Sequence, residues 1–277
     1  MGHHQLSAHH LHLSYGELPV LADASITIEP GQNVAILGAN GSGKTSLLRC
    51  LSGALTPDSG DICVDGMPLR HTRDGLRTHR TQVQLVVQDP DDQLFSADVR
   101  RDVSFGPLNL GLTTAQATQR VEHALDALGI AHLADRPTHR LSFGQRKRVA
   151  IAGALAMRPC LMLLDEPTAG LDPAGVTEAL HALATLRSEG TTVVMSTHDV
   201  DLAFTWADTI AVVHDRQVTT GPPLAMLSNV ELLHAARLQP PWMVRLAQAA
   251  GKPLSEVPTS VEHLAATLCA GVSTPAL

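Results

Sequence analysis

Short apolar runs that end at a glycine or a polar residue recur along the chain and predict buried strands. Four such runs are almost wholly apolar over four or five residues: 34–37, 161–164, 192–196 and 210–213. Continuous apolar runs, in place of strict alternation, are typical of strands buried on both faces of a parallel sheet. Further strands are expected from less regular segments at 11–15, 25–28, 62–64 and 83–87.

Segments with a helical spacing of apolar residues lie between the predicted strands. We expect helices over 45–52, 112–128 and 174–189, each followed at once by a glycine that suits a helix C-terminus. Residues 89–157 are mostly helical in character and interrupt the strand pattern as an insertion. Strands that alternate with helices predict a mostly parallel α/β core.

The chain changes character after Gly221, where prolines at 240–241, 253 and 258 break it into short segments. This pattern predicts a C-terminal appendage of short helices. The total of 277 residues suits one large domain with such a small addition.

Composition narrows the classes of partner. The net charge of −7 and an aromatic content of 3% disfavour nucleic acid, which usually selects basic surfaces and stacking aromatics. The longest apolar run, 149–157, is far short of the ~20 residues that span a bilayer. The N-terminus also lacks the apolar core of a signal peptide. We therefore expect a cytosolic chain that reaches a membrane only through partners.

The histidines near the N-terminus are open to two interpretations, whereas the spacing of the cysteines excludes a zinc or disulfide framework. Five of the 15 histidines lie near the N-terminus: His3, His4, His9, His10 and His12. They indicate either a solvated, poorly ordered terminus or weak binding of a transition metal by imidazole. The four cysteines, at 50, 63, 160 and 269, form no C-x-x-C pair and therefore no zinc or disulfide framework.

One segment matches the pattern G-x-x-x-x-G-K-[ST] in full, between a predicted buried strand and a predicted helix. Its residues are Gly38, Ala39, Asn40, Gly41, Ser42, Gly43, Lys44 and Thr45. Glycines allow successive backbone N–H groups to form a concave anion site at the start of the helix. Lys44 then supplies charge to the β- and γ-phosphates, and the Thr45 hydroxyl is a ligand for Mg²⁺.

Two acidic residues, Asp165 and Glu166, follow the apolar run 161–164. Ligands bind at the carboxyl ends of parallel strands, so both side chains are expected beside the phosphate loop. We expect Asp165 to hold Mg²⁺ directly or through water, and Glu166 to orient and polarise the attacking water. Together the two segments predict a P-loop NTPase that binds ATP and Mg²⁺.

The sequence Leu-Ser-Phe-Gly-Gln at 141–145 resembles the LSGGQ signature of ABC ATPases, with Phe143 in place of the first glycine. The resemblance implies nucleotide contacts from Ser142, Gly144 and Gln145. The change at Phe143 is expected to narrow the signature loop slightly without removing activity.

Four more residues match ABC ATPase positions in the expected order. By resemblance, Tyr15 stacks on adenine and Gln88 senses both Mg²⁺ and the attacking water. Asp172 belongs to the loop that crosses between subunits, and His198 contacts the γ-phosphate. The implied catalytic residues are therefore Glu166, His198 and Gln88, and the implied Mg²⁺ ligands are Thr45, Gln88 and Asp165.

The resemblance covers roughly residues 6–225 and implies the ABC ATPase fold of P-loop NTPases. That fold has a mostly parallel core sheet, an N-terminal antiparallel β-subdomain and an inserted helical subdomain, here at about 89–157. The chain carries one phosphate loop and one signature, so it resembles half of a dimer with itself or a close paralogue. In such a dimer the Ser142 loop of one subunit covers nucleotide held by Lys44 of the other. The appendage, at 226–277, is expected to contribute a dimer contact.

Three stretches, 89–95, 103–107 and 142–152, resemble ATPases of energy-coupling factor importers, especially the cobalt and nickel branch. The tail around Pro240-Pro241-Trp242 is similar to that group as well. This resemblance implies an integral membrane coupling subunit and a substrate-binding membrane subunit as partners, and a peripheral position at the cytoplasmic face of the cell membrane. Co²⁺ is the expected cargo, with Ni²⁺ or a vitamin as the alternative.

The acidic loop 89–92 is open to two interpretations. It forms either a negative groove for a basic coupling helix of a membrane partner or simply a solvated loop. A different class, an ABC ATPase acting on DNA or the ribosome, usually has long coiled coils or two cassettes in one chain. Neither is found in this sequence.

Overall fold

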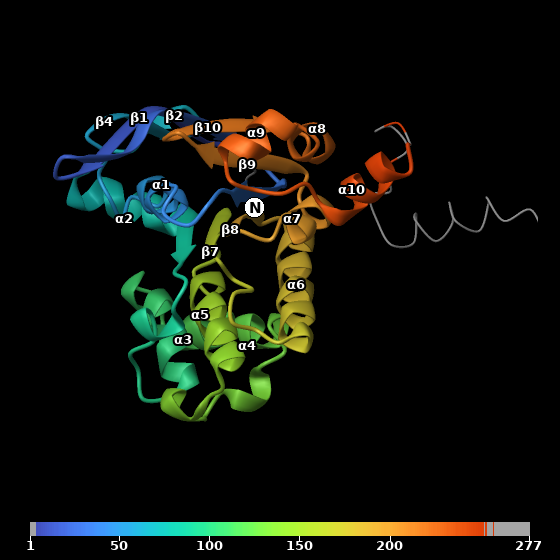
Figure 1. The fold of residues 1–277 in the computed structure, drawn as a ribbon. Helices are drawn as coiled ribbons and strands as arrows, with labels where there is room; N and C mark the ends of the chain where they lie inside the picture. The colour runs from blue at the N-terminus through green and yellow to red at the C-terminus, as the bar shows by residue number, and fades with distance from the viewer. Residues whose placement is uncertain (1–3, 252, 254–256, 258–277) are drawn as a thin grey trace, which may run out of the picture.

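The main sheet has the mostly parallel arrangement that the apolar runs predict. A computed structural model describes residues 4–251, 253 and 257. Six strands lie in the order β10-β9-β3-β8-β7-β6, and every neighbouring pair except β9–β10 is parallel (Figure 1). Their bounds are β3 Asn33–Leu37, β6 Val83–Val86, β7 Leu161–Asp165, β8 Thr192–Thr197, β9 Thr209–His214 and β10 Gln217–Gly221.

Each central strand contributes to two different cores because successive side chains point to opposite faces of the sheet. In β7, Leu161 and Leu163 belong to the core shared with the N-terminal sheet. Met162 and Leu164, between and after them, belong to the core shared with the helical lobe. All five residues of β7 are buried, which explains why its sequence does not alternate.

A second, antiparallel sheet is built mostly by the N-terminal residues and has the strand order β2-β1-β4-β5. Helix α1 (Lys44–Leu51) packs its leucines into the core between the two sheets. The strands are β1 Leu6–Tyr15, β2 Leu18–Ile28, β4 Ser59–Val64 and β5 Met67–Pro68. The mostly parallel core sheet and the antiparallel N-terminal sheet expected from the sequence are both present.

The expectation of a poorly ordered, histidine-rich terminus is wrong for His9, His10 and His12, which lie inside β1. Strand β1 begins at Leu6, not at residue 11, because it is the centre of its sheet and pairs with both β2 and β4. The three imidazoles occupy exposed positions of the strand, while the leucines between and around them are buried. Among the described residues no group of three potential metal ligands is found.

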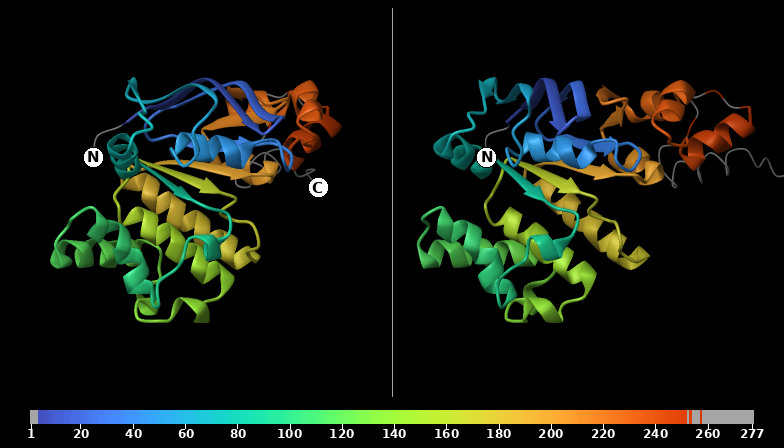
Figure 2. Two further views of the ribbon diagram at one scale, coloured as in Figure 1. Left: turned by 90° about the vertical axis from the view of Figure 1, so that its left-hand side faces the viewer. Right: turned by 60° about the vertical axis from the view of Figure 1, so that its left-hand side comes forward.

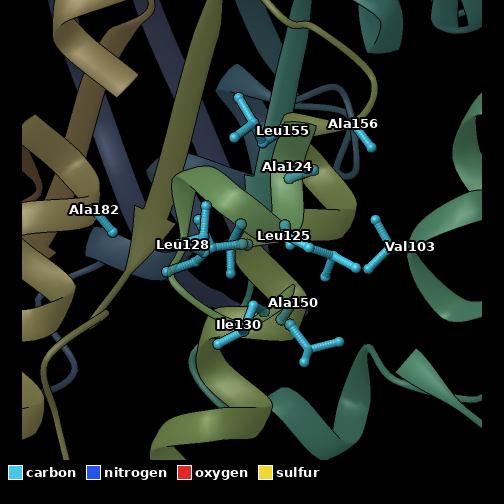
Figure 3. Packing of buried hydrophobic residues seen from close by; sticks show 14 of the residues in the cluster. Val103, Ala124, Leu125, Leu128, Ile130, Ala150, Leu155, Ala156 and Ala182 are labelled. Atoms are coloured by element: carbon cyan, nitrogen blue, oxygen red, sulfur yellow. The ribbon is translucent and has the colours of Figure 1, made fainter. Parts of the chain in front are cut away.

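A helical lobe extends from the sheet core and lies at the same end of the molecule in every view (Figures 1 and 2). Its apolar centre joins side chains from several helices, such as Val103, Leu125 and Ala150, with Ala182 of α6 nearby (Figure 3). The elements are η1 Pro90–Asp92, α3 Val99–Asn109, α4 Thr114–Ala127, η2 Ala131–Leu133, η3 Thr138–Arg140, α5 Phe143–Leu155 and α6 Pro173–Ser188.

Short helices at the C-terminal end cover the rest of the sheet face that packs against the helical lobe, over β3 and β9. Leu227, Leu233 and Val244 pack in one core with Leu37 and Val212 of the sheet. The helices are α7 Val200–Trp206, α8 Pro223–Leu227, α9 Val230–Ala235 and α10 Trp242–Ala249. Residues 226–251 of the predicted appendage are described, whereas nearly all of the part after residue 251, with Pro258 and Cys269, lies outside the described residues. Within the described chain, no helix combines the length and hydropathy needed to cross a bilayer.

Candidate active site

The phosphate loop connects the carboxyl end of β3 to the first turn of α1. A side chain at position 38 would not fit, because a Cβ there would lie 2.5 Å from Ser42 Oγ and 2.6 Å from the Val213 carbonyl oxygen. Gly43 is the N-cap of α1, and no side chain caps the helix. The first N–H groups of the helix are therefore available to an anion. The Ser42 hydroxyl is buried beside Gly38, and within the described structure it has no hydrogen-bond partner.

Lys44 is buried at the start of α1, with its ammonium turned toward the loop. The Nζ atom donates to the carbonyl oxygens of Gly38 at 2.9 Å and Ala39 at 3.2 Å. It also lies 3.9 Å from Glu166 Oε1. Burial lowers the pKa of Lys44, while the carboxylates of Glu166 and Asp165 act in the opposite direction. A buried cation beside free helix N–H groups is suited to a triphosphate.

Asp165 is held between hydroxyls from two other elements. Its Oδ2 accepts a hydrogen bond from Thr45 Oγ1 at 2.7 Å, and its Oδ1 accepts one from Ser196 Oγ at 2.5 Å. Ser196 is on β8, which pairs directly with β7, so the sheet fixes this geometry. A carboxylate next to a hydroxyl provides the oxygen ligands that Mg²⁺ prefers. The donor set therefore fits the Mg²⁺ site predicted from Thr45 and Asp165.

Glu166 is the first residue after β7 and has a strained backbone. Its φ of 48° lies in the left-handed region, where a non-glycine residue costs roughly 1–3 kcal/mol and which is concentrated at functional sites. Its N–H donates to Ser196 Oγ at 3.0 Å, which helps to hold the turn. Its carboxylate Oε2 lies 3.0 Å from Nδ1 of His198, whose side chain is exposed at the rim. The pair places a carboxylate at the site with an imidazole to orient it.

One cavity of about 570 Å³ contains most of the residues predicted to bind nucleotide. Tyr15 lies at its mouth, where its hydroxyl is 3.3 Å from Ser46 Oγ. Sequence reasoning missed Val20, Ser46 and Ser196; Val20 lies in an apolar strand with no motif, and only the hairpin of β1 and β2 brings it to Tyr15. The cavity is lined by Tyr15, Val20, Asn40, Gly41, Gly43, Lys44, Thr45, Ser46, Gln88, Asp165, Glu166 and His198.

The signature residues lie elsewhere in the chain and do not line this cavity. Ser142 is the N-cap of α5: its hydroxyl accepts from the N–H of Gln145 at 3.3 Å, and the Gln145 side chain accepts from the N–H of Ser142 at 3.0 Å. Asp172 caps α6 in the same way, accepting from the N–H of Gly175 at 2.7 Å. Both Ser142 and Asp172 are exposed.

A family model described as ABC transporter matches residues 21–169. This stretch includes the phosphate loop, the Ser142 turn and the Asp165–Glu166 pair. The chain belongs to the ABC transporter family. The resemblance noted on the signature and on the phosphate loop is thereby confirmed, and the enzyme class of this ABC protein is that of an ATPase.

Two curated relatives narrow the branch. The chain is 49% identical over 259 residues to the cobalt import ATP-binding protein CbiO of Rhodobacter capsulatus, covering 91% of this chain and 92% of the relative. It is 42% identical over 234 residues to the energy-coupling factor transporter ATP-binding protein EcfA of Methanocaldococcus jannaschii, covering 84% of each chain. The predicted likeness to energy-coupling factor ATPases is confirmed.

Two solved structures share the fold of this ABC protein. CbiO1 of Clostridium perfringens, described as part of the transporter complex CbiONQ, is 40% identical with a TM-score of 0.76 and covers 89% of this chain and 100% of that chain. The ATP-binding cassette MJ0796, solved as a dimer in a post-hydrolysis state with ADP and phosphate, is 26% identical with a TM-score of 0.71. That match covers 79% of this chain and 98% of the other.

Proposed function

We propose that two copies of this chain bind and hydrolyse ATP between them and drive an energy-coupling factor importer, with Co²⁺ as its cargo. One observation carries the first part of the proposal. The phosphate-binding and hydrolytic residues converge on one cavity, whereas Ser142 is exposed on another part of the same chain. A second copy is therefore needed to bring a signature turn to the γ-phosphate.

Hydrolysis then depends on positioning and on charge. Lys44 and the N–H groups at the start of α1 bind the phosphates, and Tyr15 with Val20 forms the wall for the adenine. Thr45, Gln88 and Asp165 would hold Mg²⁺, which neutralises phosphate charge when bound. Glu166 orients the attacking water and accepts its proton, and His198 fixes the Glu166 carboxylate at 3.0 Å.

Dimer formation follows from the chemistry of the incomplete site and is supported by the dimeric relative MJ0796, whose structure contains ADP and phosphate. In a two-fold dimer both copies contribute the same two surfaces, so two complete sites form at once. The exposed Ser142 and Asp172 lie on the surface that faces the partner. Gly144 and Gln145, beside Ser142, complete the turn that covers the γ-phosphate. ATP stabilises the closed dimer, and loss of phosphate releases it.

A groove of about 930 Å³ is the proposed seat for a helix of the membrane coupling subunit. It lies between α2 (Arg73–Gln82), with its basic side chains, and the end of α3, where Phe95 and Phe105 meet edge to face at 4.7 Å. Phe95 is 65% and Phe105 49% exposed, and adjoining exposed apolar side chains of this kind mark interaction sites. The chain would thereby be held at the cytoplasmic face of the membrane.

The acidic loop 89–92 does not form the negative groove for a basic helix that was one of its two interpretations. The Asp91 carboxylate is already paired with Arg146 at 2.8 Å, and the Asp89 side chain caps the short helix η1. None of the four loop residues lines the groove. We therefore propose contact through aromatic and basic side chains and not through a negative surface.

The cargo is proposed from the relatives, because the ATPase itself does not touch it. Co²⁺ is favoured by the 49% identical cobalt import protein, and Ni²⁺ or a vitamin is the alternative. The deciding experiment reconstitutes the chain with its membrane subunits in vesicles and measures ATP-driven uptake of Co²⁺, Ni²⁺ and a vitamin in parallel. We expect Co²⁺ uptake that is lost with Glu166→Gln. Vitamin uptake that needs no metal would contradict the cargo.

A further inference from the structure

Lys147 is a buried cation that the hydrolytic scheme above does not use. It lies on α5, one turn after Phe143, with only 5% of its surface exposed. Its Nζ donates to the carbonyl oxygen of Glu166 at 2.7 Å and to that of Ala169 at 2.8 Å. The ammonium thus spans the backbone turn 166–169 that begins at the hydrolytic carboxylate.

The hydrogen bonds made by Lys147 satisfy backbone carbonyls of this turn, which follows the end of strand β7. Strand β7 ends at Asp165, and the left-handed backbone at Glu166 turns its carbonyl away from the sheet. A buried carbonyl without a donor is costly, and a charged donor forms the stronger hydrogen bond. No carboxylate of the described structure is hydrogen-bonded to Lys147, so its direct partners are these two carbonyls, while the charges of Glu166, Asp89 and Asp165 favour the ammonium from a greater distance.

Phe143, the residue that departs from the usual signature, covers this arrangement. Its ring centroid lies 5.3 Å from Lys147 Nζ, within the range of a cation–π contact. The ring also packs so tightly on Gly170 that a Cβ there would lie 3.0 Å from Phe143 Cε1. The signature turn is therefore fastened to the 166–170 segment twice, by the Lys147 ammonium and by the Phe143 ring.

We propose that Lys147 is a positioning residue that couples the signature helix to the hydrolytic carboxylate, so that Glu166 reaches its working position only when α5 is correctly seated. This proposal rests on the proposed ATPase function and adds a residue that contacts neither phosphate nor Mg²⁺. Lys147 does not line the nucleotide cavity, so it affects the turnover step and not nucleotide binding. Phe143 strengthens the same link by shielding the ammonium.

The test replaces Lys147 by methionine, which keeps most of the apolar part of the side chain and removes the donor. Arg120→Met is the matched control, since the Arg120 guanidinium also donates to a backbone carbonyl, that of Met157 at 3.2 Å, at the far end of α5. We expect Lys147→Met to lower kcat about 10- to 100-fold, because a displacement of about 1 Å in an active site can cost about 100-fold. The affinity for MgATP, measured with a fluorescent analogue, stays within about threefold of wild type because only the turnover step loses an interaction.

Lys147→Gln carries the same test if the methionine variant does not fold, because its amide is polar but too short to span both carbonyls. The proposal is overturned if both variants keep kcat within about threefold, since a positioning interaction must appear in turnover. It is equally overturned if nucleotide affinity falls in step with kcat or if Arg120→Met lowers kcat as much. A wild-type chain without ATPase activity contradicts the proposed function and this proposal together, whereas an active Lys147→Met contradicts this proposal alone.

Discussion

The phosphate loop and the signature turn of this chain differ in how their polar groups are satisfied. In the first region Lys44, Asp165 and Glu166 are buried and bonded to one another or to neighbouring backbone. In the second region Ser142 and Asp172 are exposed, and their side chains cap helices. The first region is preorganised within one chain, whereas the second, under the proposed function, acts on nucleotide held by the other copy.

The largest expected effect tests the preorganised region. Glu166→Gln keeps the size of the side chain and its distance to His198, but it removes the group that accepts a proton from water. We expect ATP turnover to fall by at least about 100-fold, as for loss of a general base, while ATP binding is retained. Size-exclusion chromatography with ATP should then show an accumulated dimer. Turnover close to that of wild type would remove Glu166 from its assigned role.

The second prediction tests the exposed region by mixing two inactive variants. Ser142→Arg disrupts the signature turn that covers the nucleotide, and Lys44→Ala removes the phosphate-binding cation. Each variant alone should therefore lose nearly all ATP turnover. A mixed dimer has one site with an intact loop and an intact turn, so an equal mixture should recover up to about a quarter of wild-type activity. Each variant at the same total concentration is the control. An inactive mixture that still forms mixed dimers, or an active Ser142→Arg monomer, would contradict the division between the two regions.

The smallest effect concerns Lys147, where the two regions meet. Burial lowers the pKa of Lys147 from 10.5 to about 8, while Glu166, Asp89 and Asp165 oppose the shift. Between those two values the unfolded chain binds more protons than the folded chain, so the contribution of Lys147 to the free energy of unfolding rises with pH. Urea unfolding at pH 7 and pH 9.5 should therefore show wild type gaining stability relative to Lys147→Met. A difference that is independent of pH would contradict the buried-charge description.

The sequence predicts the phosphate loop well because its chemistry is local. Eight consecutive residues between a buried strand and a helix determine both the backbone path and the bound group. The apolar runs that became β3, β7, β8 and β9 were equally clear, since strands buried on both faces need little information from the rest of the chain.

Two of the elements that the sequence analysis missed are strongly polar. Helix α2 has only His79 buried, so it carries almost no apolar periodicity. Strand β10 is an edge strand whose pairing with β9 stabilises it more than its own burial does. The prediction of a poorly ordered terminus at the histidines of β1 was wrong for a related reason, because a strand with one exposed face tolerates polar residues on that face.

The buried position of Lys147 was not predicted because the residue lies in a basic run, Arg146 to Arg148, and such runs are typical of a solvated surface. Only the tertiary structure turns one of these three side chains inward to the carbonyls after β7. Ser196 is similar, since its importance depends on the pairing of β8 with β7 and not on any motif. Contacts between distant segments are the part of the site that a single sequence does not reveal.

The tight hairpin between β9 and β10 has a consequence for how the gene can be altered. Its two loop residues, Asp215 and Arg216, both have positive φ, as a two-residue turn requires, and the Arg216 carbonyl accepts from the N–H of Ala22 at 2.9 Å. Ala22 belongs to the same strand as Val20, which forms part of the adenine wall. One additional residue in this turn would move the Arg216 carbonyl away from the N–H of Ala22 and remove their hydrogen bond. The adenine wall at Val20 would thereby lose support from a turn almost two hundred residues further along the chain. Tags and reporter insertions are therefore better placed in another surface loop.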